Sequence, residues 1–358
     1  MTSKNKFHLF LFLLILFIAP TFVCANENNE GKIDVKELVL EHNADAHEWH
    51  ITTINDKKIS IPLPVIVKSS QGWQCFMSSK FDENPNGIYR NLYVNHEGKI
   101  CEIVGENQPE KKVTLDISIT KNVIELWTVV ILLCIIFLYC AHWYKGKRPE
   151  DKAPKGFVGF MEMFTLYIYE DIISQAMPAK QVKRYAPYLL TAFYFIFTSN
   201  LLGLIPIFPG GANLTGNIAI TFFLALCTMF LVNIFGNKEY WKDILWPDVP
   251  WWLKAPVPLI PVIEIFGIFT KPFALMVRLF ANIFGGHAIA ISLTCVIFLT
   301  FQMGIGKGVS IGGVSFLLMI FMDLLEILVA FIQALVFTIL SAVFIGLAHQ
   351  EHSHTETI

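Results

Sequence analysis

The chain has 358 residues, of which 54% are hydrophobic and only 16% are charged. Soluble domains contain roughly 25% charged residues, so this composition is typical of a membrane protein. The formal net charge of -2 gives no basis for nucleic-acid binding, which requires a basic surface.

Residues 1–25 have the pattern of a secretory signal peptide. A basic start is followed by an apolar centre at residues 9–18 and by the cleavage-site spacing of Val23-Cys24-Ala25. An uncleaved anchor is the alternative, although the apolar run is short for a membrane span. We therefore expect the mature N-terminus to lie on the extracytoplasmic side.

Residues 26–121 are polar and mixed, and we expect them to form a small α+β or β-containing extracytoplasmic domain. The segment from 35 to 50 is compatible with a short helix, whereas 59–68 and 88–94 alternate as strands do. Turn residues gather at 84–87 and again at 95–98.

Two cysteines of this exported region, Cys75 and Cys101, could form a disulfide, because such bonds persist outside the cytoplasm. The histidines near residue 47 and in the C-terminal tail lack a recognised ligand spacing. We therefore predict no metal site. A solvated polar face is the simpler interpretation for the first group, and a disordered end for the tail.

Residues 122–349 are predicted to form an all-α membrane domain with about five membrane helices and one interfacial helix, followed by a flexible tail at 350–358. The first span covers about Val123 to Tyr144. Basic residues between 145 and 155 assign the next connection to the cytoplasm by the positive-inside rule, in agreement with an exported N-terminus. The mixed apolar and acidic segment at 156–177 suits a helix at the cytoplasmic surface.

Two further spans are expected at 186–208 and 218–236, followed by a charged cytoplasmic loop at 238–254. The last apolar segments, 256–302 and 311–348, each exceed the ~20 residues that a perpendicular span needs. We interpret them as a long, strongly tilted helical hairpin, with Gly304, Gly306 and Gly308 marking its turn.

Arg278 lies inside the first hairpin segment, with apolar residues on both sides. A guanidinium keeps its charge, and its transfer into a membrane costs at least ~2.5 kcal/mol. Such a residue indicates function by default. The alternative is an arginine that snorkels to the headgroups from a helix end.

Other polar residues accompany Arg278 in the hairpin. Asn282 is one helical turn further on, whereas His287, nine residues on, points to the opposite side. In the second segment Glu326 and Gln333, seven residues apart, share a face. His287 beside Glu326 would satisfy both side chains, either as a structural ion pair or as part of a proton path.

At this point the sequence resembles a known family, subunit a of the membrane sector of F-type ATP synthases. The likeness covers roughly residues 120–350, and the segments 200–206 and 215–218 take part in it. The residues that carry it most specifically are Lys271-Pro272, Arg278-Leu279-Phe280-Ala281-Asn282, Gly286 and Gln333.

The resemblance implies a non-catalytic, proton-translocating subunit without a cofactor, placed in the bacterial inner membrane with its C-terminus in the cytoplasm. Its partners would be the ring of c subunits, the b subunits of the peripheral stalk and the rest of the ATP synthase. Two offset half-channels would pass protons to and from the rotating ring. The absence of a GxxxxGK[ST] phosphate loop from the sequence agrees with nucleotide chemistry in other subunits.

The resemblance also implies roles for single residues. Arg278 matches the essential arginine that faces the ring carboxylates, and Gln333 the glutamine paired with it. Glu264 matches an acidic residue of the cytoplasmic exit path.

Three positions depart from the common pattern. Many members have glutamate at the position of His287 and histidine at that of Glu326, so the pair would survive with its partners exchanged. Gly203 stands where an aspartate is frequent, and we therefore assign no proton-uptake role to that position.

Two other functions remain open from the residues alone. A proton- or ion-coupled secondary transporter could use the same polar side chains, but the two matching repeats typical of that class are not visible. A membrane-anchored receptor or assembly factor would depend on residues 26–121, and deletion of that region would discriminate it.

Overall fold

The computed structural model describes residues 45–54, 57–84, 87–95, 98–103, 111–148, 151–205, 210–245, 259–302 and 305–349. The expected signal peptide and the expected tail lie outside these residues. The chain divides into two compact units. Unit 1 contains residues 1–129, 201–214 and 284–327, and unit 2 contains residues 130–200, 215–283 and 328–358.

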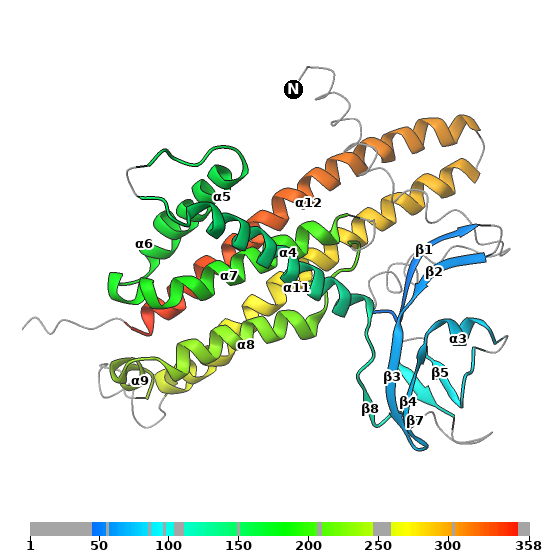
Figure 1. The fold of residues 1–358 in the computed structure, drawn as a ribbon, viewed down its shortest axis with the longest axis horizontal. Coiled ribbons are helices and arrows are strands. Elements are labelled where there is room, and N and C mark those ends of the chain that lie inside the picture. Colours follow the sequence, from blue (N-terminus) through cyan, green and yellow to red (C-terminus); the bar gives the residue numbers. More distant parts are fainter. Residues whose placement is uncertain are drawn as a thin grey trace, which may run out of the picture. The chain divides into compact units, whose positions relative to one another are not determined.

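Short antiparallel strands form the N-terminal part of unit 1 (Figure 1). They make three small sheets, and a short helix follows the fourth strand. The sheets are β1 (Glu48–Ile54) with β2 (Lys57–Pro62); β4 (Gly72–Met77), β3 (Pro64–Ser69) and β8 (Leu115–Asp116); and β5 (Leu92–Val94), β6 (Ile100–Glu102) and β7 (Lys111–Lys112); the helix is α3 (Ser79–Asp82).

The core of this region follows from the alternation of residues in β3. Val65 and Val67 are fully buried, and they pack with Phe81, Leu92 and Ile100. Alternate residues of a strand point to opposite faces, so one face of β3 fills this core. The small β-containing domain expected from the sequence is thus present.

The structure corrects one local prediction for this region and confirms another except at a single residue. The described end of the predicted helix at 35–50 lies in β1, where Trp49 pairs with Ile61. The predicted strand at 59–68 is interrupted at Leu63, whose N–H bonds the Ser78 side chain at 3.0 Å. The prolines on both sides of Leu63 lack the N–H that a continuous ladder requires.

The possible disulfide between Cys75 and Cys101 is not formed in the structure. Cys75 lies in β4 opposite Ile66, whereas Cys101 lies in β6 opposite Tyr93. The two strands belong to different sheets, and Cys75 is exposed while Cys101 is buried. The strand pairing therefore gives each cysteine another neighbour.

Helices form the rest of the described chain before the hairpin. The first connects the strand region to the membrane segments, and the next three follow one another closely. They are α4 (Lys121–Tyr144), α5 (Phe157–Leu166), the π-helix η2 (Tyr167–Ile173), α6 (Ser174–Ala176), α7 (Ala179–Gly203), α8 (Ile218–Ile234) and α9 (Lys238–Leu245).

One apolar core holds unit 2 together. Leu189, Phe193 and Ile196 of α7 are fully buried, at the spacing that places residues on one helical face. Ile168 and Ile173 of η2 belong to the same core. The segment predicted as an interfacial helix is thus helical, and one of its faces is covered by protein.

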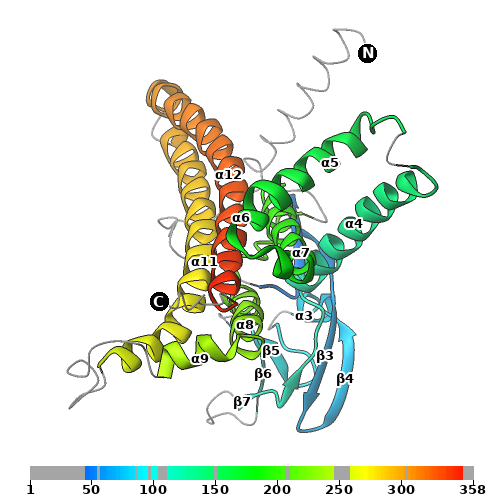
Figure 2. The same ribbon diagram turned by 90° about the vertical axis from the view of Figure 1, so that its left-hand side faces the viewer.

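The last two helices, α11 (Leu259–Gln302) and α12 (Ile305–Leu347), run side by side in both views (Figures 1 and 2). At about 65 Å each, they are roughly twice as long as the ~30 Å hydrocarbon core of a bilayer. The predicted long hairpin is confirmed. Gly306 and Gly308 belong to α12, so the turn is shorter than predicted.

Three described helices are long and apolar enough to cross a membrane, namely α4, α11 and α12. α8 and α9 meet at a bend of 98° and would together supply a fourth crossing. α7, the remaining predicted span, does not reach that apolarity. A charged loop was predicted from residue 238, but α9 (Lys238–Leu245) occupies the first part of that segment, so the prediction was wrong there.

Candidate functional site

Arg278 lies on the side of α11 that faces away from the core of unit 2. Leu275, Met276 and Leu279 are buried, whereas Arg278 and Asn282 are exposed. Residues three or four apart share a helical face, so the buried residues form the packed face and the two polar residues the free one. The guanidinium is therefore presented outward from an apolar helix.

Gln333 of α12 contacts the same turn of α11. Its side chain is only 3% exposed, and its Nε2 donates a hydrogen bond to the backbone oxygen of Arg278 at 2.6 Å. Leu275, Leu279 and Phe337 surround this contact and leave no room for a water molecule. The structure thus brings together the two predicted residues, with the bond made to the backbone of Arg278.

Glu264 lies about four helical turns before Arg278 and is half-buried on α11. A methyl group placed on Gly267 would lie 3.9 Å from Glu264 Oε2 and 3.8 Å from Lys271 Cε. The side chains of Glu264 and Lys271 therefore lie on either side of Gly267. Lys271 Nζ also lies 5.8 Å from the ring centre of Phe344 on α12.

His287 belongs to unit 1 and lies beside Gly203. A methyl group on Gly203 would be 3.7 Å from His287 Nε2 and 3.2 Å from the backbone oxygen of Ala212. The bare glycine therefore leaves space for the imidazole. A longer side chain at position 203 would compete with His287 for this space.

Glu326 of α12 packs against Gly286 instead of pairing with His287. A methyl group on Gly286 would lie 2.5 Å from Glu326 Oε1, which is buried and has no hydrogen-bond partner among the described residues. The expected direct pair of His287 and Glu326 is wrong for the described residues, whose ion pairs do not include it. Successive residues of a helix point about 100° apart, so His287 faces away from the side chain that meets Gly286.

A buried polar contact near the end of α7 was not predicted. Thr215 Oγ1 donates to Asn200 Oδ1 at 2.6 Å, and the Asn200 amide reaches the backbone oxygen of Ala330 at 3.4 Å. Both Thr215 and Asn200 are almost fully buried. One indication of this contact was present in the sequence, because Asn200 and Thr215 both lie in segments that take part in the family resemblance.

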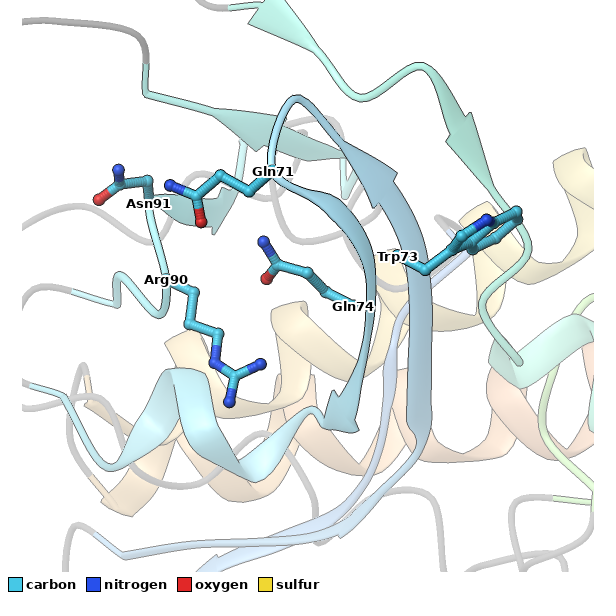
Figure 3. Close-up of a pocket in the computed structure, with 5 residues that line it drawn as sticks. All are labelled: Gln71, Trp73, Gln74, Arg90 and Asn91. Carbon is cyan, nitrogen blue, oxygen red and sulfur yellow. The ribbon is translucent and has the colours of Figure 1, made fainter.

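The strand region contains a pocket of about 390 Å³ that sequence reasoning also missed. Gln71, Gln74 and Arg90 extend toward a common space, whereas Trp73 points away from it (Figure 3). Arg90 and Asn91 have positive φ angles of 49° and 61°. These side chains could bind a polar or anionic group.

The chain matches the family described as ATP synthase A chain over residues 124–346. Residues 38–123 match a domain of unknown function. Curated relatives named ATP synthase subunit a include that of Chlorobium phaeobacteroides, 41% identical over 67% of this chain and 68% of the relative. The Myxococcus xanthus protein is 37% identical over 67% of this chain and 78% of the relative.

Proposed function

Because the chain belongs to the ATP synthase A chain family, the proton-translocating subunits of the membrane sector, we propose that Arg278 is the fixed cation which faces the moving ring. The chain is thus a multi-pass membrane protein and a component of the ATP synthase complex.

The outward exposure of Arg278 carries this proposal. Its helix buries Leu275 and Leu279 but leaves Arg278 and Asn282 exposed on its other face. The ion pairs of the described residues do not include Arg278, and a cation at such a place needs an acidic partner from outside the chain. A carboxylate carried past by a c subunit would supply one, and the nearby positive charge would favour its deprotonated form.

Gln333 would hold this arrangement in position. Its bond to the backbone of Arg278 ties α12 to the arginine-bearing turn of α11. A rigid turn keeps the guanidinium at one height relative to the passing carboxylates. Each carboxyl group of the ring then loses its proton as it reaches Arg278, so protons cannot pass Arg278 directly from one half-channel to the other.

Two groups of residues would connect this centre to the two aqueous phases. Glu264 would serve the cytoplasmic exit, and His287 with Glu326 the extracytoplasmic access. The basic residues between 145 and 155 support an extracytoplasmic N-terminus and a cytoplasmic C-terminus in a bacterial inner membrane. Each proton that passes down the potential releases ~2.3 kcal/mol per 100 mV, and the chain itself makes no covalent bond.

The test uses membrane vesicles that contain the whole synthase with Arg278→Ala or Arg278→Lys. We expect ATP synthesis driven by an imposed proton gradient to fall to background in both. Arg278→Lys keeps the charge but not the planar, delocalised guanidinium. Immunoblots for this chain and for c and b subunits report whether the complex assembles.

Arg148→Ala is the matched control, because Arg148 is an exposed arginine of the connection after α4. It should leave the synthesis rate unchanged. A normal rate in assembled Arg278→Ala vesicles would refute the proposed role. An equal loss in Arg148→Ala would show that removal of any cation suffices.

A further inference from the structure

Glu125 in the second turn of α4 is a buried carboxyl group that the proposed function leaves without a role. Its side chain is fully buried, and neither Oε1 nor Oε2 has a hydrogen-bond partner among the described residues. A buried carboxyl group without donors disfavours its charged form strongly. The group must hold a proton or exchange one with water that enters.

The surroundings of Glu125 lie within unit 1 and contain charged groups from two other parts of the chain. Lys121, one turn earlier on α4, interacts electrostatically with Glu125, with Asp45 and with His287. Lys121 is therefore the common neighbour of an acid at the edge of the strand region, a buried acid and the imidazole beside Gly203.

The start of α4 is fixed to the strand region by backbone contacts. The N–H of Lys121 donates to Ala46 O at 3.0 Å, and that of Asn122 donates to Asp45 Oδ1 at 3.2 Å. Asp45 thus caps α4 as a carboxylate at a helix N-terminus. These contacts fix the position of the first turns of α4, including Glu125, relative to the strand region.

We propose that Glu125 is a proton-binding group on the extracytoplasmic access path, between the strand region and His287. This inference rests on the proposed function. A proton from water adds to the Glu125 carboxylate, leaves it for the neutral His287 imidazole through intervening water, and continues toward the ring.

Lys121 makes this transfer reversible. Its positive charge favours the Glu125 carboxylate and opposes a lasting charge on His287. Neither group then traps the proton. The strand region would thus contribute to the mouth of the path through Asp45 and the start of α4.

A purely structural carboxyl provides the matched comparison. Glu102 is 5% exposed, but it accepts hydrogen bonds from the backbone N–H and the hydroxyl of Ser70. Its neighbours satisfy it, so it has no need to exchange a proton. Glu125 is buried to a similar extent without such donors.

The test reconstitutes the complete synthase in liposomes and measures ATP synthesis against the pH on the side that supplies protons. Glu125→Gln should slow synthesis by roughly tenfold or more, since a positioned proton-transfer group contributes on the order of 10²-fold and water can replace part of it. Glu125→Asp should retain most of the rate with a shifted pH profile. Glu102→Gln should match the wild type in rate and profile.

Normal rates and an unchanged pH profile in assembled Glu125→Gln would overturn the inference. If this variant does not assemble, Glu125→Asp still decides, because an unchanged profile there contradicts a proton-binding role. Arg278→Ala, measured in parallel, separates the two proposals. If Arg278→Ala abolishes ATP synthesis while Glu125→Gln synthesises ATP at the normal rate, only the role of Glu125 is refuted. If Arg278→Ala still synthesises ATP, the proposed function is refuted.

Discussion

Replacement of Gly286 by alanine should displace the carboxyl group of Glu326. The added methyl group would lie 2.5 Å from Oε1, 3.2 Å from Cδ and 3.3 Å from Cγ of Glu326. Ordinary contact begins at 3.4 Å, so the carboxyl oxygen must retreat by about 1 Å. The end of a flexible side chain can make this movement without loss of the fold.

The effect on stability should be small, because two contributions oppose each other. Alanine in place of glycine inside a helix contributes about 1 kcal/mol. Overpacking costs typically about 1–3 kcal/mol. The net change in the free energy of unfolding should therefore lie between zero and a loss of about 2 kcal/mol.

The effect on proton transfer should be larger. A misplacement of about 1 Å can lower a rate on the order of 10²-fold. We expect Gly286→Ala to slow gradient-driven ATP synthesis in vesicles by roughly this factor at a normal level of membrane protein. Glu326→Asp, which is shorter by one methylene, should restore part of the rate when combined with Gly286→Ala.

Gly285→Ala is the adjacent control. A methyl group there meets no atom of the described residues within 4 Å, so its rate should stay near that of the wild type. A full rate in Gly286→Ala would refute the link between the position of Glu326 and proton transfer. Failure of Glu326→Asp to improve the double variant would exclude the steric explanation.

Two further predictions concern stability. Burial opposes the ionisation of Asp116. The His47 imidazole, 3.7 Å from Asp116 Oδ2, and the hydrogen bond from the Ser118 N–H outweigh burial and keep the pKa of Asp116 below its ordinary value. This stabilisation is present above the unfolded pKa of about 3.9 and is lost as the pH falls through the folded pKa. Hydrogen exchange in β8 should show this loss in the wild type but not in Asp116→Asn. Asn217 accepts a hydrogen bond from Ala219 N at 3.0 Å as the N-cap of α8, so Asn217→Ala should cost about 1 kcal/mol in thermal unfolding and Asn217→Asp much less.

The order of the helices could be predicted from the sequence because apolar length is a local property. α4, α8, α11 and α12 begin or end within a few residues of the predicted spans, apart from the extended start of α12. The resemblance to subunit a rested on adjacent residues around Arg278, and the family match agrees with it. Such motifs need no knowledge of packing.

Contacts between distant segments could not be derived in the same way. Helical periodicity correctly separates the directions of Arg278 and His287, but it does not say which residue of α12 reaches either one. Gln333 reaches the backbone of Arg278, 55 positions away. Glu326 meets Gly286 instead of His287, because only glycine allows such an approach to the helix backbone.

The sequence alone determined that this chain spans a membrane and carries one arginine in an apolar helix, since both follow from residue type and spacing. Only the tertiary structure decided that Arg278 is exposed, that Cys75 and Cys101 remain apart, and that Glu125 is enclosed without donors. Exposure and hydrogen bonding depend on which surfaces cover a side chain. That covering is supplied by segments far away in the chain.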